Sequence, residues 1–127
     1  MIIMKIAIPV NDDSGPGSKL TPNYSQCNFF LVVGLDNGKA VAYNTIPNEV
    51  PPNLKGVRGA MAFLLAGKGV EAVIVHRIAE TDRLTLVGNN IRIFTGATGT
   101  ASDAITQYLA GGLKENSECK SSDICGC

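Results

Sequence analysis

The chain opens with an apolar stretch, residues 2–10, which is followed by a long polar segment, residues 11–26. Apart from Lys5, the first stretch is apolar at consecutive positions, which is typical of a central strand covered on both sides. The polar segment has no periodicity, and irregular segments of more than about 12 residues are uncommon in compact domains unless they carry function. We therefore expect a buried first strand and a functional loop.

Two further apolar stretches, residues 29–35 and 40–46, are separated by a short polar segment that contains Asn37-Gly38. These two residues supply the positive φ angles that a tight hairpin turn needs. The pattern predicts that the second and third strands form an antiparallel hairpin. The next segment, residues 47–53, contains three prolines and is expected to be a stiff, non-helical connection.

The following part of the chain alternates between helical and strand patterns. Apolar residues recur at helical spacing over residues 54–67, which predicts a helix with one apolar stripe. Residues 70–75 and 91–94 are short apolar runs that predict buried strands. Residues 78–88 should form the helix between them, although residues 84–87 favour a strand by their composition.

The last predicted helix begins at a sequence that resembles a capping box, residues 100–103, and ends before Gly111-Gly112. The segment after it, residues 113–127, is polar and lacks the apolar periodicity of a docked helix. We therefore predict one domain over residues 1–112 and a flexible, cysteine-containing tail over residues 113–127.

This order of elements predicts an α/β fold. A hairpin followed by right-handed β-α-β units gives a five-stranded mixed sheet in the order 3-2-1-4-5, with strand 2 antiparallel and helices on its faces. The strand order reverses beside the first strand, and ligands of such sheets bind outside the carboxyl ends of the strands at that point. Residues 9–13, His76-Arg77 and residues 95–97 should gather there.

Composition and charge exclude several classes of function. The chain of 127 residues has 11 basic and 11 acidic residues, so its formal charge is zero. Without a basic excess, nucleic-acid binding is not expected. The apolar runs are far shorter than the ~20 residues that span a bilayer, and the start of the chain is a poor signal peptide. We expect a cytoplasmic protein that binds neither nucleic acid nor membranes.

Three of the four cysteines lie in the last nine residues. Cys119, Cys125 and Cys127 provide thiolates, which suit copper(I), zinc or iron–sulfur species, although their spacing is not a standard zinc pattern. Three interpretations stay open: capture of a metal or cluster, an inert tail, and a thiol-redox pair formed by Cys125 and Cys127. Cys27, where the loop rejoins a strand, is expected to be a buried hydrophobe more than a ligand.

Other candidate ligands belong to the predicted strand ends. His76, the one histidine of the chain, can ligate a metal, and Arg77 together with Arg58 can hold an anion. The glycine-rich segment that starts at Gly96 is either an anion cradle built from backbone N–H groups or an ordinary strand-to-helix turn. It lacks the lysine and spacing of a P-loop, and the carboxylates are too few for a two-metal nuclease. We expect no enzymatic activity.

Several segments resemble the dinitrogenase iron–molybdenum cofactor family, which includes NifX and the C-terminal part of NifB. The resemblance covers roughly residues 4–113 and is carried by residues 5–10, 29–33, 36–39, 96–100, 104–105 and 108–111. It implies a ribonuclease H-like fold and the binding or carriage of an iron–molybdenum–sulfur cofactor or its precursor. A relative, the orange protein, holds a molybdenum–copper sulfide cluster, and many members have no assigned role.

The chain departs from the family pattern in two places. Asn23-Tyr24-Ser25 replaces a His-Phe-Gly sequence that is common near the end of the first loop, and His76-Arg77 stands where many members have glycines. The change in the first loop removes a candidate ligand histidine. The change after the fourth strand adds a histidine beside a fixed cation.

Two hypotheses follow from the resemblance and the candidate residues. The first is a non-enzymatic carrier of an anionic metal–sulfur cofactor, which takes part in cofactor biosynthesis or delivery and meets cofactor-assembly proteins. Its predicted cofactor-binding residues are Asn11, Asn23, Tyr24, Arg58, His76, Arg77 and Gly96, and its predicted metal ligands are Cys119, Cys125 and Cys127. The second is a regulatory or adaptor module that kept the fold and lost the cofactor.

Overall fold

The computed structural model describes residues 4–12, 15–21, 27–36, 38–47 and 60–115 of the chain. In chain order, its elements are β1 (Met4–Val10), η1 (Gly15–Gly17), β2 (Phe29–Asp36), β3 (Lys39–Pro47), α1 (Ala60–Gly67), β4 (Ala72–Ile74), α2 (Glu80–Gly88), β5 (Arg92–Thr95), α3 (Ala101–Leu109) and β6 (Lys114–Glu115). Strands and helices follow one another as the sequence predicts, apart from the short 3-10 helix η1 and the final strand β6.

The described strands form one mixed sheet in the order β3-β2-β1-β4-β5-β6. Strand β1 pairs antiparallel with β2 and parallel with β4, and β4 pairs parallel with β5. The predicted order of the first five strands and the antiparallel direction of strand 2 are confirmed. The strand order reverses beside β1. Because β1, β4 and β5 are parallel, their carboxyl ends lie at the same edge of the sheet.

The predicted number of five strands is wrong, because β6 adds a sixth. Glu115 pairs with Phe94 and Lys114 pairs with Thr95 across an antiparallel ladder. An ion pair with 2.7 Å between Arg92 Nη2 and Glu115 Oε1 also holds this edge. A two-residue polar edge strand depends on backbone pairing and carries no apolar alternation, so the sequence pattern could not reveal it. Residues 114–115 therefore belong to the sheet.

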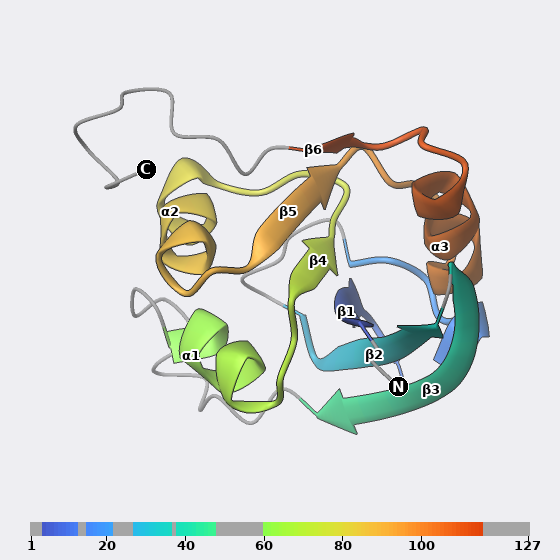
Figure 1. Cartoon of the computed structure of the whole chain (residues 1–127), viewed down its shortest axis with the longest axis horizontal. Coiled ribbons are helices and arrows are strands. Elements are labelled where there is room, and N and C mark those ends of the chain that lie inside the picture. Colours follow the sequence, from blue (N-terminus) through green and yellow to red (C-terminus); the bar gives the residue numbers. More distant parts are fainter. Residues whose placement is uncertain (1–3, 13–14, 22–26, 37, 48–59, 116–127) are drawn as a thin grey trace.

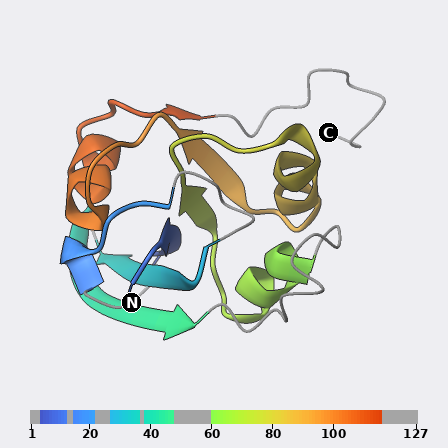
Figure 2. The ribbon, with the colours of Figure 1, turned by 180° about the vertical axis from the view of Figure 1, so that it is seen from behind.

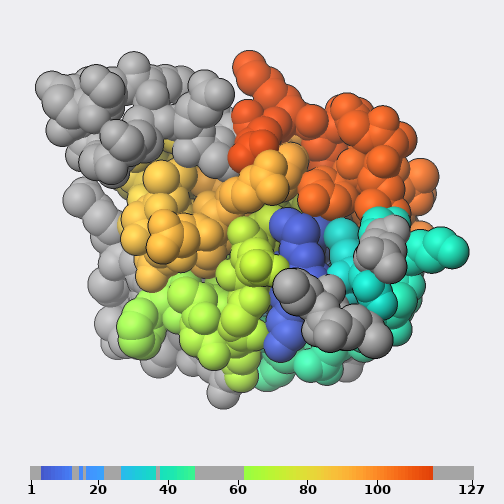
Figure 3. Space-filling model, viewed as in Figure 1, coloured from blue at the N-terminus to red at the C-terminus, as the bar shows by residue number. Residues whose placement is uncertain are grey.

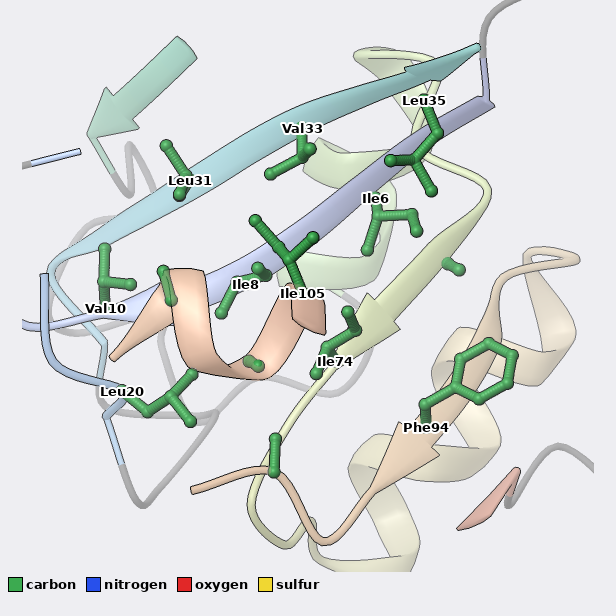
Figure 4. Packing of buried hydrophobic residues seen from close by; sticks show 14 residues of the cluster. Ile6, Ile8, Val10, Leu20, Leu31, Val33, Leu35, Ile74, Phe94 and Ile105 are labelled. Atoms are coloured by element: carbon green, nitrogen blue, oxygen red, sulfur yellow. The ribbon is translucent and has the colours of Figure 1, made fainter. Parts of the chain in front are cut away.

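Helix α3 covers one face of the sheet, and α1 and α2 cover the other (Figure 1). Side chains of β1 divide between these layers: Ile6 and Ile8 join the cluster that contains Ile105 of α3, whereas Ala7 joins the cluster that contains Leu86 of α2. Figure 4 shows Ile105 above Ile8 in the first of these clusters. The prediction of a first strand buried on both faces is confirmed.

The hairpin of β2 and β3 forms as the sequence predicts. Asp36 pairs with Lys39, and the ladder shifts by one residue between Gly34 and Leu35. Gly38 in the turn has φ +78°, a conformation that glycine adopts without strain. Strand β3 forms one edge of the sheet and is exposed along most of its length.

Helix α2 forms although residues 84–87 favour a strand by composition. Strands β4 and β5 are parallel, so the chain must cross from one end of the sheet to the other between them. The helix buries Leu86 completely against the sheet, and this burial outweighs a weak local preference. Helix α1 is described from residue 60, and the earlier part of the helix predicted over residues 54–67 lies outside the described residues.

Arg83 of α2 is buried, with 1 % of its surface exposed. Its Nε donates a hydrogen bond of 2.9 Å to Glu80 Oε1, and its Nη2 lies 2.5 Å from Glu80 Oε2. These hydrogen bonds raise the pKa of Arg83, so its guanidinium remains charged at any pH at which the protein is studied. The aliphatic part of this side chain fills space in the interior.

A capping box begins α3, as the sequence predicts. Thr100 Oγ1 accepts a hydrogen bond of 3.2 Å from the backbone N–H of Asp103, and Asp103 Oδ2 accepts one of 3.1 Å from the backbone N–H of Thr100. The two bonds satisfy donors that a helix start otherwise leaves without intrahelical partners. The last turn of the helix is followed by Gly111, whose φ is +77°.

We expect Thr100→Ala to lower the free energy of unfolding by about 1 kcal/mol, because the cap loses its side-chain acceptor. Chemical denaturation followed by circular dichroism measures this change. Thr106→Ala on the same helix is the control, because the Thr106 hydroxyl only donates back to the carbonyl of Ser102 and its loss should be close to neutral. Equal effects of the two substitutions would contradict a capping role.

Candidate functional site

The candidate site lies where the strand order reverses. Strand β1 is central, with β2 antiparallel on one side and β4 parallel on the other. In the space-filling view of Figure 3, β1 is the blue strand between β4 and β2. The segments that follow β1, β4 and β5 therefore leave the sheet at one edge and come together there, as the topology predicts.

The first loop folds back onto this edge. After β1, the backbone N–H of Asn11 donates to the carbonyl of Lys19 at 3.1 Å, and that of Thr21 donates to the carbonyl of Pro9 at 3.0 Å. Thr21 Oγ1 also donates to Asn11 Oδ1 at 2.9 Å. Leu20, which directly precedes Thr21, forms an isolated bridge with Val10. The described part of the loop is thus an ordered wall of the site.

The same loop also holds the segment that leads into α3. The N–H of Leu20 donates to the carbonyl of Gly99 at 3.2 Å, and the N–H of Ala101 donates to the carbonyl of Ser18 at 2.8 Å. Ser18 is completely buried. Figure 2 shows η1 of this loop beside α3 and β3, with which it is in contact. Segments from both ends of the domain therefore build one side of the site.

A pocket of about 360 Å³ lies between these segments. Its volume is within the range of small-molecule sites. The residues that line it come from the first loop, from the end of β4 and from the segment after β5, and they are Leu20, His76, Arg77, Ala97, Thr98 and Gly99. The pocket thus joins one imidazole and one guanidinium with a wall of small side chains.

His76 is held by the segment after β5. Its Nδ1 lies 3.0 Å from the carbonyl oxygen of Ala97. Two backbone bonds continue the β4–β5 ladder past the strand ends: Gly96 N–H donates to the carbonyl of His76 at 3.0 Å, and Ala97 N–H donates to that of Val75 at 3.2 Å. The ring is therefore fixed by its own hydrogen bond and by the backbone on which it stands.

Arg77 supplies the positive charge of the pocket wall. Its side chain is exposed, and within the described residues no carboxylate lies within ion-pair distance of it. Arg83 and Arg92, in contrast, form ion pairs with Glu80 and Glu115. The guanidinium of Arg77 can therefore bind an anion in the pocket without breaking an ion pair to any carboxylate of the described residues.

The glycine-rich turn after β5 uses most of its N–H groups within the protein. Gly96 donates to His76 and Ala97 to Val75. Thr98 N–H donates to the side-chain oxygen of Gln107 at 3.2 Å. The N–H of Thr100 takes part in the capping box. These bonds match an ordinary strand-to-helix turn with a good cap, and they leave few backbone donors in the turn for an anion.

The predicted site residues are distributed as follows. His76 and Arg77 line the pocket together, whereas Asn11 lies at the start of the loop and binds Thr21. Gly96 precedes the lining residue Ala97 and is not itself part of the pocket wall. The remaining predicted ligands lie outside the described residues: Asn23, Tyr24, Arg58, Cys119, Cys125 and Cys127.

Leu20 was not predicted to be part of the site, whereas Thr98 belongs to the glycine-rich segment that the sequence indicates as a candidate anion cradle. Leu20 is an isolated aliphatic residue in a polar loop. This contrast was the one signal in the sequence that could have indicated a buried position for Leu20. Its side chain is 9 % exposed and packs with the cluster under α3 (Figure 4). Cys27 is 1 % exposed within the cluster on the α1 and α2 face, which confirms the expectation of a buried residue.

A second cavity, of about 500 Å³, lies at the opposite end of the sheet. Met4 at the start of β1, Leu35 near the end of β2, and Phe94 and Tyr108 are among its lining residues. Arg92, its cation, is paired with Glu115. This cavity lies at the amino end of β1 and has no thiol or imidazole among its lining residues, so the smaller pocket is the stronger candidate for metal chemistry.

The donor set of the pocket limits what it can hold. Within the described ranges, no group of three or more His, Cys, Asp or Glu residues is arranged to bind a metal ion. A bare ion enclosed by described side chains therefore does not fit this structure. An anionic metal complex that brings its own ligands does fit, since one imidazole and one guanidinium offer a ligand atom and a charge.

The structure is a small α/β domain with a pocket at the carboxyl ends of its parallel strands. A family model for the dinitrogenase iron–molybdenum cofactor matches residues 4–111. The chain belongs to the dinitrogenase iron–molybdenum cofactor family, as its sequence predicts.

The chain is also similar to one curated protein and to solved structures. The chain is similar to the uncharacterized protein MJ0580 of Methanocaldococcus jannaschii, with 27 % identity over 113 residues, which are 89 % of this chain and 92 % of the relative. The crystal structure of PH0822 has a TM-score of 0.76 and 21 % identity, over 89 % of this chain and 96 % of that one. The apo form of the orange protein from Desulfovibrio gigas has a TM-score of 0.76 and 18 % identity, over 91 % and 94 % of the two chains. At these identities, the two structures show a shared fold.

None of the helices in the described part of the chain has the length and apolar character that crossing a bilayer requires.

Proposed function

We propose that the chain binds an anionic metal–sulfur cofactor, either an iron–molybdenum–sulfur cluster or a molybdenum–copper sulfide, in the pocket at the carboxyl ends of β1, β4 and β5. One observation carries the proposal: His76 and Arg77 share the wall of a pocket at the reversal of the strand order. Membership of the dinitrogenase iron–molybdenum cofactor family supports the choice of ligand.

The chain's own residues would bind and position such a group. Arg77 attracts the negative charge, and His76 offers a ring nitrogen. Leu20 and Ala97 provide apolar surface beside these two exposed side chains. The role is carriage of the cofactor for its biosynthesis or delivery, without bond-making chemistry on a substrate and with cofactor-assembly proteins as partners.

Several finer predictions belong to the same proposal. They are a ribonuclease H-like classification of the fold, a location in the cytoplasm, and a tail whose Cys119, Cys125 and Cys127 capture or hand over metal. The domain boundary at residue 112 also remains a prediction. Because β6 occupies residues 114–115, a truncation that tests the tail should end after Glu115, so that the sheet remains complete.

The first test measures metal and acid-labile sulfide after strictly anaerobic purification, with the full chain beside the truncation after Glu115. Both forms are then incubated with isolated iron–molybdenum cofactor and with a preformed molybdenum–copper sulfide cluster. Retention of molybdenum and sulfide by both forms supports a site in the domain. Retention by the full chain alone assigns binding to the tail, and no retention by either contradicts the proposal.

We expect Arg77→Gln to weaken cluster binding by about tenfold, which corresponds to the loss of a hydrogen-bonded charge contact. Equilibrium dialysis with molybdenum analysis measures the affinity. Arg92→Gln is the control, because it removes the same charge from the opposite end of the sheet. Equal losses in the two variants would indicate a general charge effect and would remove Arg77 from the site.

A second candidate function is a regulatory or adaptor module without cofactor. The hydrogen bonds within the glycine-rich turn favour it, since Gly96, Ala97, Thr98 and Thr100 donate their N–H groups to the protein. This candidate predicts a folded domain that retains neither molybdenum nor sulfide in the experiment above.

A further inference from the structure

We propose that His76 is a single-point metal ligand that uses Nε2, and that the pocket selects an anionic metal complex with one exchangeable coordination position. This inference rests on the proposed function and specifies the ligand of the same pocket. It starts from the tautomer of the imidazole.

The contact with Ala97 determines which ring nitrogen carries the proton. A backbone carbonyl has only lone pairs, so the 3.0 Å contact between Nδ1 and the Ala97 oxygen is a hydrogen bond only when Nδ1 is the donor. In the neutral ring, the single proton is then on Nδ1, and Nε2 keeps its lone pair. A lone pair on Nε2 is the form in which histidine binds a metal.

The same contact is typical of histidines that bind metals. Such residues commonly donate their second ring N–H to a carboxylate, a backbone carbonyl or water, and this bond fixes the ring and increases its basicity. In this chain, the acceptor is held in place, because the N–H of Ala97 donates to Val75 and the N–H of Gly96 donates to the carbonyl of His76. The pocket therefore presents an oriented ligand atom.

The surroundings of His76 decide which class of metal species can use this atom. One neutral imidazole is too few ligands for an aqueous divalent ion, and the described residues offer no cluster of three or more donors. Arg77, on the wall of the same pocket, repels cations and attracts anions. A metal complex that carries its other ligands and a negative charge satisfies both residues.

The coordination step is a ligand substitution. The metal–oxygen bond to a bound water breaks, the water leaves, and the Nε2 lone pair forms a metal–nitrogen bond. The oxidation state of the metal does not change, and the proton on Nδ1 remains hydrogen-bonded to Ala97. No further reactant is needed.

The tautomer is tested first, by ¹⁵N NMR of the imidazole in alkaline buffer, where a histidine ring is neutral. The chain has one histidine, so its two ring nitrogens give signals without overlap from other histidines. We expect a protonated Nδ1 and an unprotonated Nε2. The opposite tautomer would overturn the inference.

The coordination is tested with two iron(II) cyanide complexes that are both anionic and diamagnetic. Pentacyanido(aqua)ferrate(II) has one exchangeable water, whereas hexacyanidoferrate(II) has none. We expect the aqua complex to shift the Nε2 signal and to bind at least about tenfold more tightly than it binds N-acetylhistidine. The hexacyanido complex should leave the Nε2 signal in place. Equal affinity for the protein and for N-acetylhistidine would contradict a built site.

His76→Asn is the matched variant, because the asparagine amide can still donate to the carbonyl of Ala97 but has no atom at the position of Nε2. We expect it to lose coordination of the aqua complex. Arg77→Gln should weaken binding about tenfold, and Arg92→Gln should not. Retention of tight binding by His76→Asn would remove His76 as the ligand.

The two proposals fail separately in these experiments. If His76 coordinates the iron probe but the protein retains no molybdenum–sulfur cluster, single-point ligation stands and the cofactor assignment is wrong. If clusters bind equally to the wild type and to His76→Asn, the cofactor assignment stands and the ligand role of His76 is wrong.

Discussion

Arg83→Ala is expected to lower the free energy of unfolding by about 3 kcal/mol, mainly because it empties space in the interior. The side chain is 2 % exposed, so its removal leaves a cavity beside the sheet. Its partner Glu80 has a side chain that is 54 % exposed and can return to water. Urea denaturation of wild type and variant measures the difference.

A second substitution at the same position separates packing from charge. Arg83→Met keeps much of the volume and is expected to lower the free energy of unfolding by about 1 kcal/mol, since apolar replacements of buried ions are often tolerated. Arg92→Met removes an exposed ion pair and should have an effect of about 1 kcal/mol or less. If Arg83→Met were as destabilising as Arg83→Ala, the guanidinium and its hydrogen bonds would be the main contribution.

Gly99→Ala is expected to lower the free energy of unfolding by about 2 to 4 kcal/mol, as the sum of backbone strain and a damaged helix cap. Gly99 has φ +86°, which side chains with a Cβ rarely adopt. A Cβ there would also lie 3.2 Å from Cβ and Cγ of Asp103 and would collide with its carboxylate oxygen. That oxygen accepts the N–H of Thr100 in the capping box.

Gly38→Ala is the control for the strain alone. Gly38 has φ +78° and open space around the position of a Cβ, so this variant should lower the free energy of unfolding by only about 1 to 2 kcal/mol. A double-mutant cycle adds Asp103→Ala, which removes the colliding carboxylate. The additional cost of Gly99→Ala should then decrease, and an unchanged cost would contradict the collision.

Much of the fold could be predicted from the sequence, because burial and turn formation depend on residue types that are close together in the chain. Residues 2–10 carried the signal of a doubly buried strand, and Gly38 that of the hairpin. Helix α2 shows where local signals fail. Leu84-Thr85-Leu86-Val87 favours a strand by composition, and only the parallel direction of β4 and β5 requires a helix between them.

The site was less predictable than the fold. The topology predicted that His76 and Arg77 lie at one edge of the sheet, where they line a pocket. The tautomer of His76 depends on Ala97, which is distant in the chain and contributes only a backbone oxygen. Such a contact leaves no trace in residue types. Leu20 lines the pocket because backbone hydrogen bonds join the first loop to Pro9 and Gly99. A sequence pattern does not encode these bonds.

The central position of β1 has a consequence for the way the chain folds during synthesis. Strand β1 can pair with β2 as soon as residues 29–36 have left the ribosome. The other edge of β1 is paired only after β4 is synthesised, because Ile6 pairs with Ala72. Until then, a meander of three strands exposes one edge of β1, whose last five residues are buried in the folded domain. Unpaired apolar edges favour association between chains. The nascent chain is therefore most prone to aggregation between the emergence of β3 and that of β4.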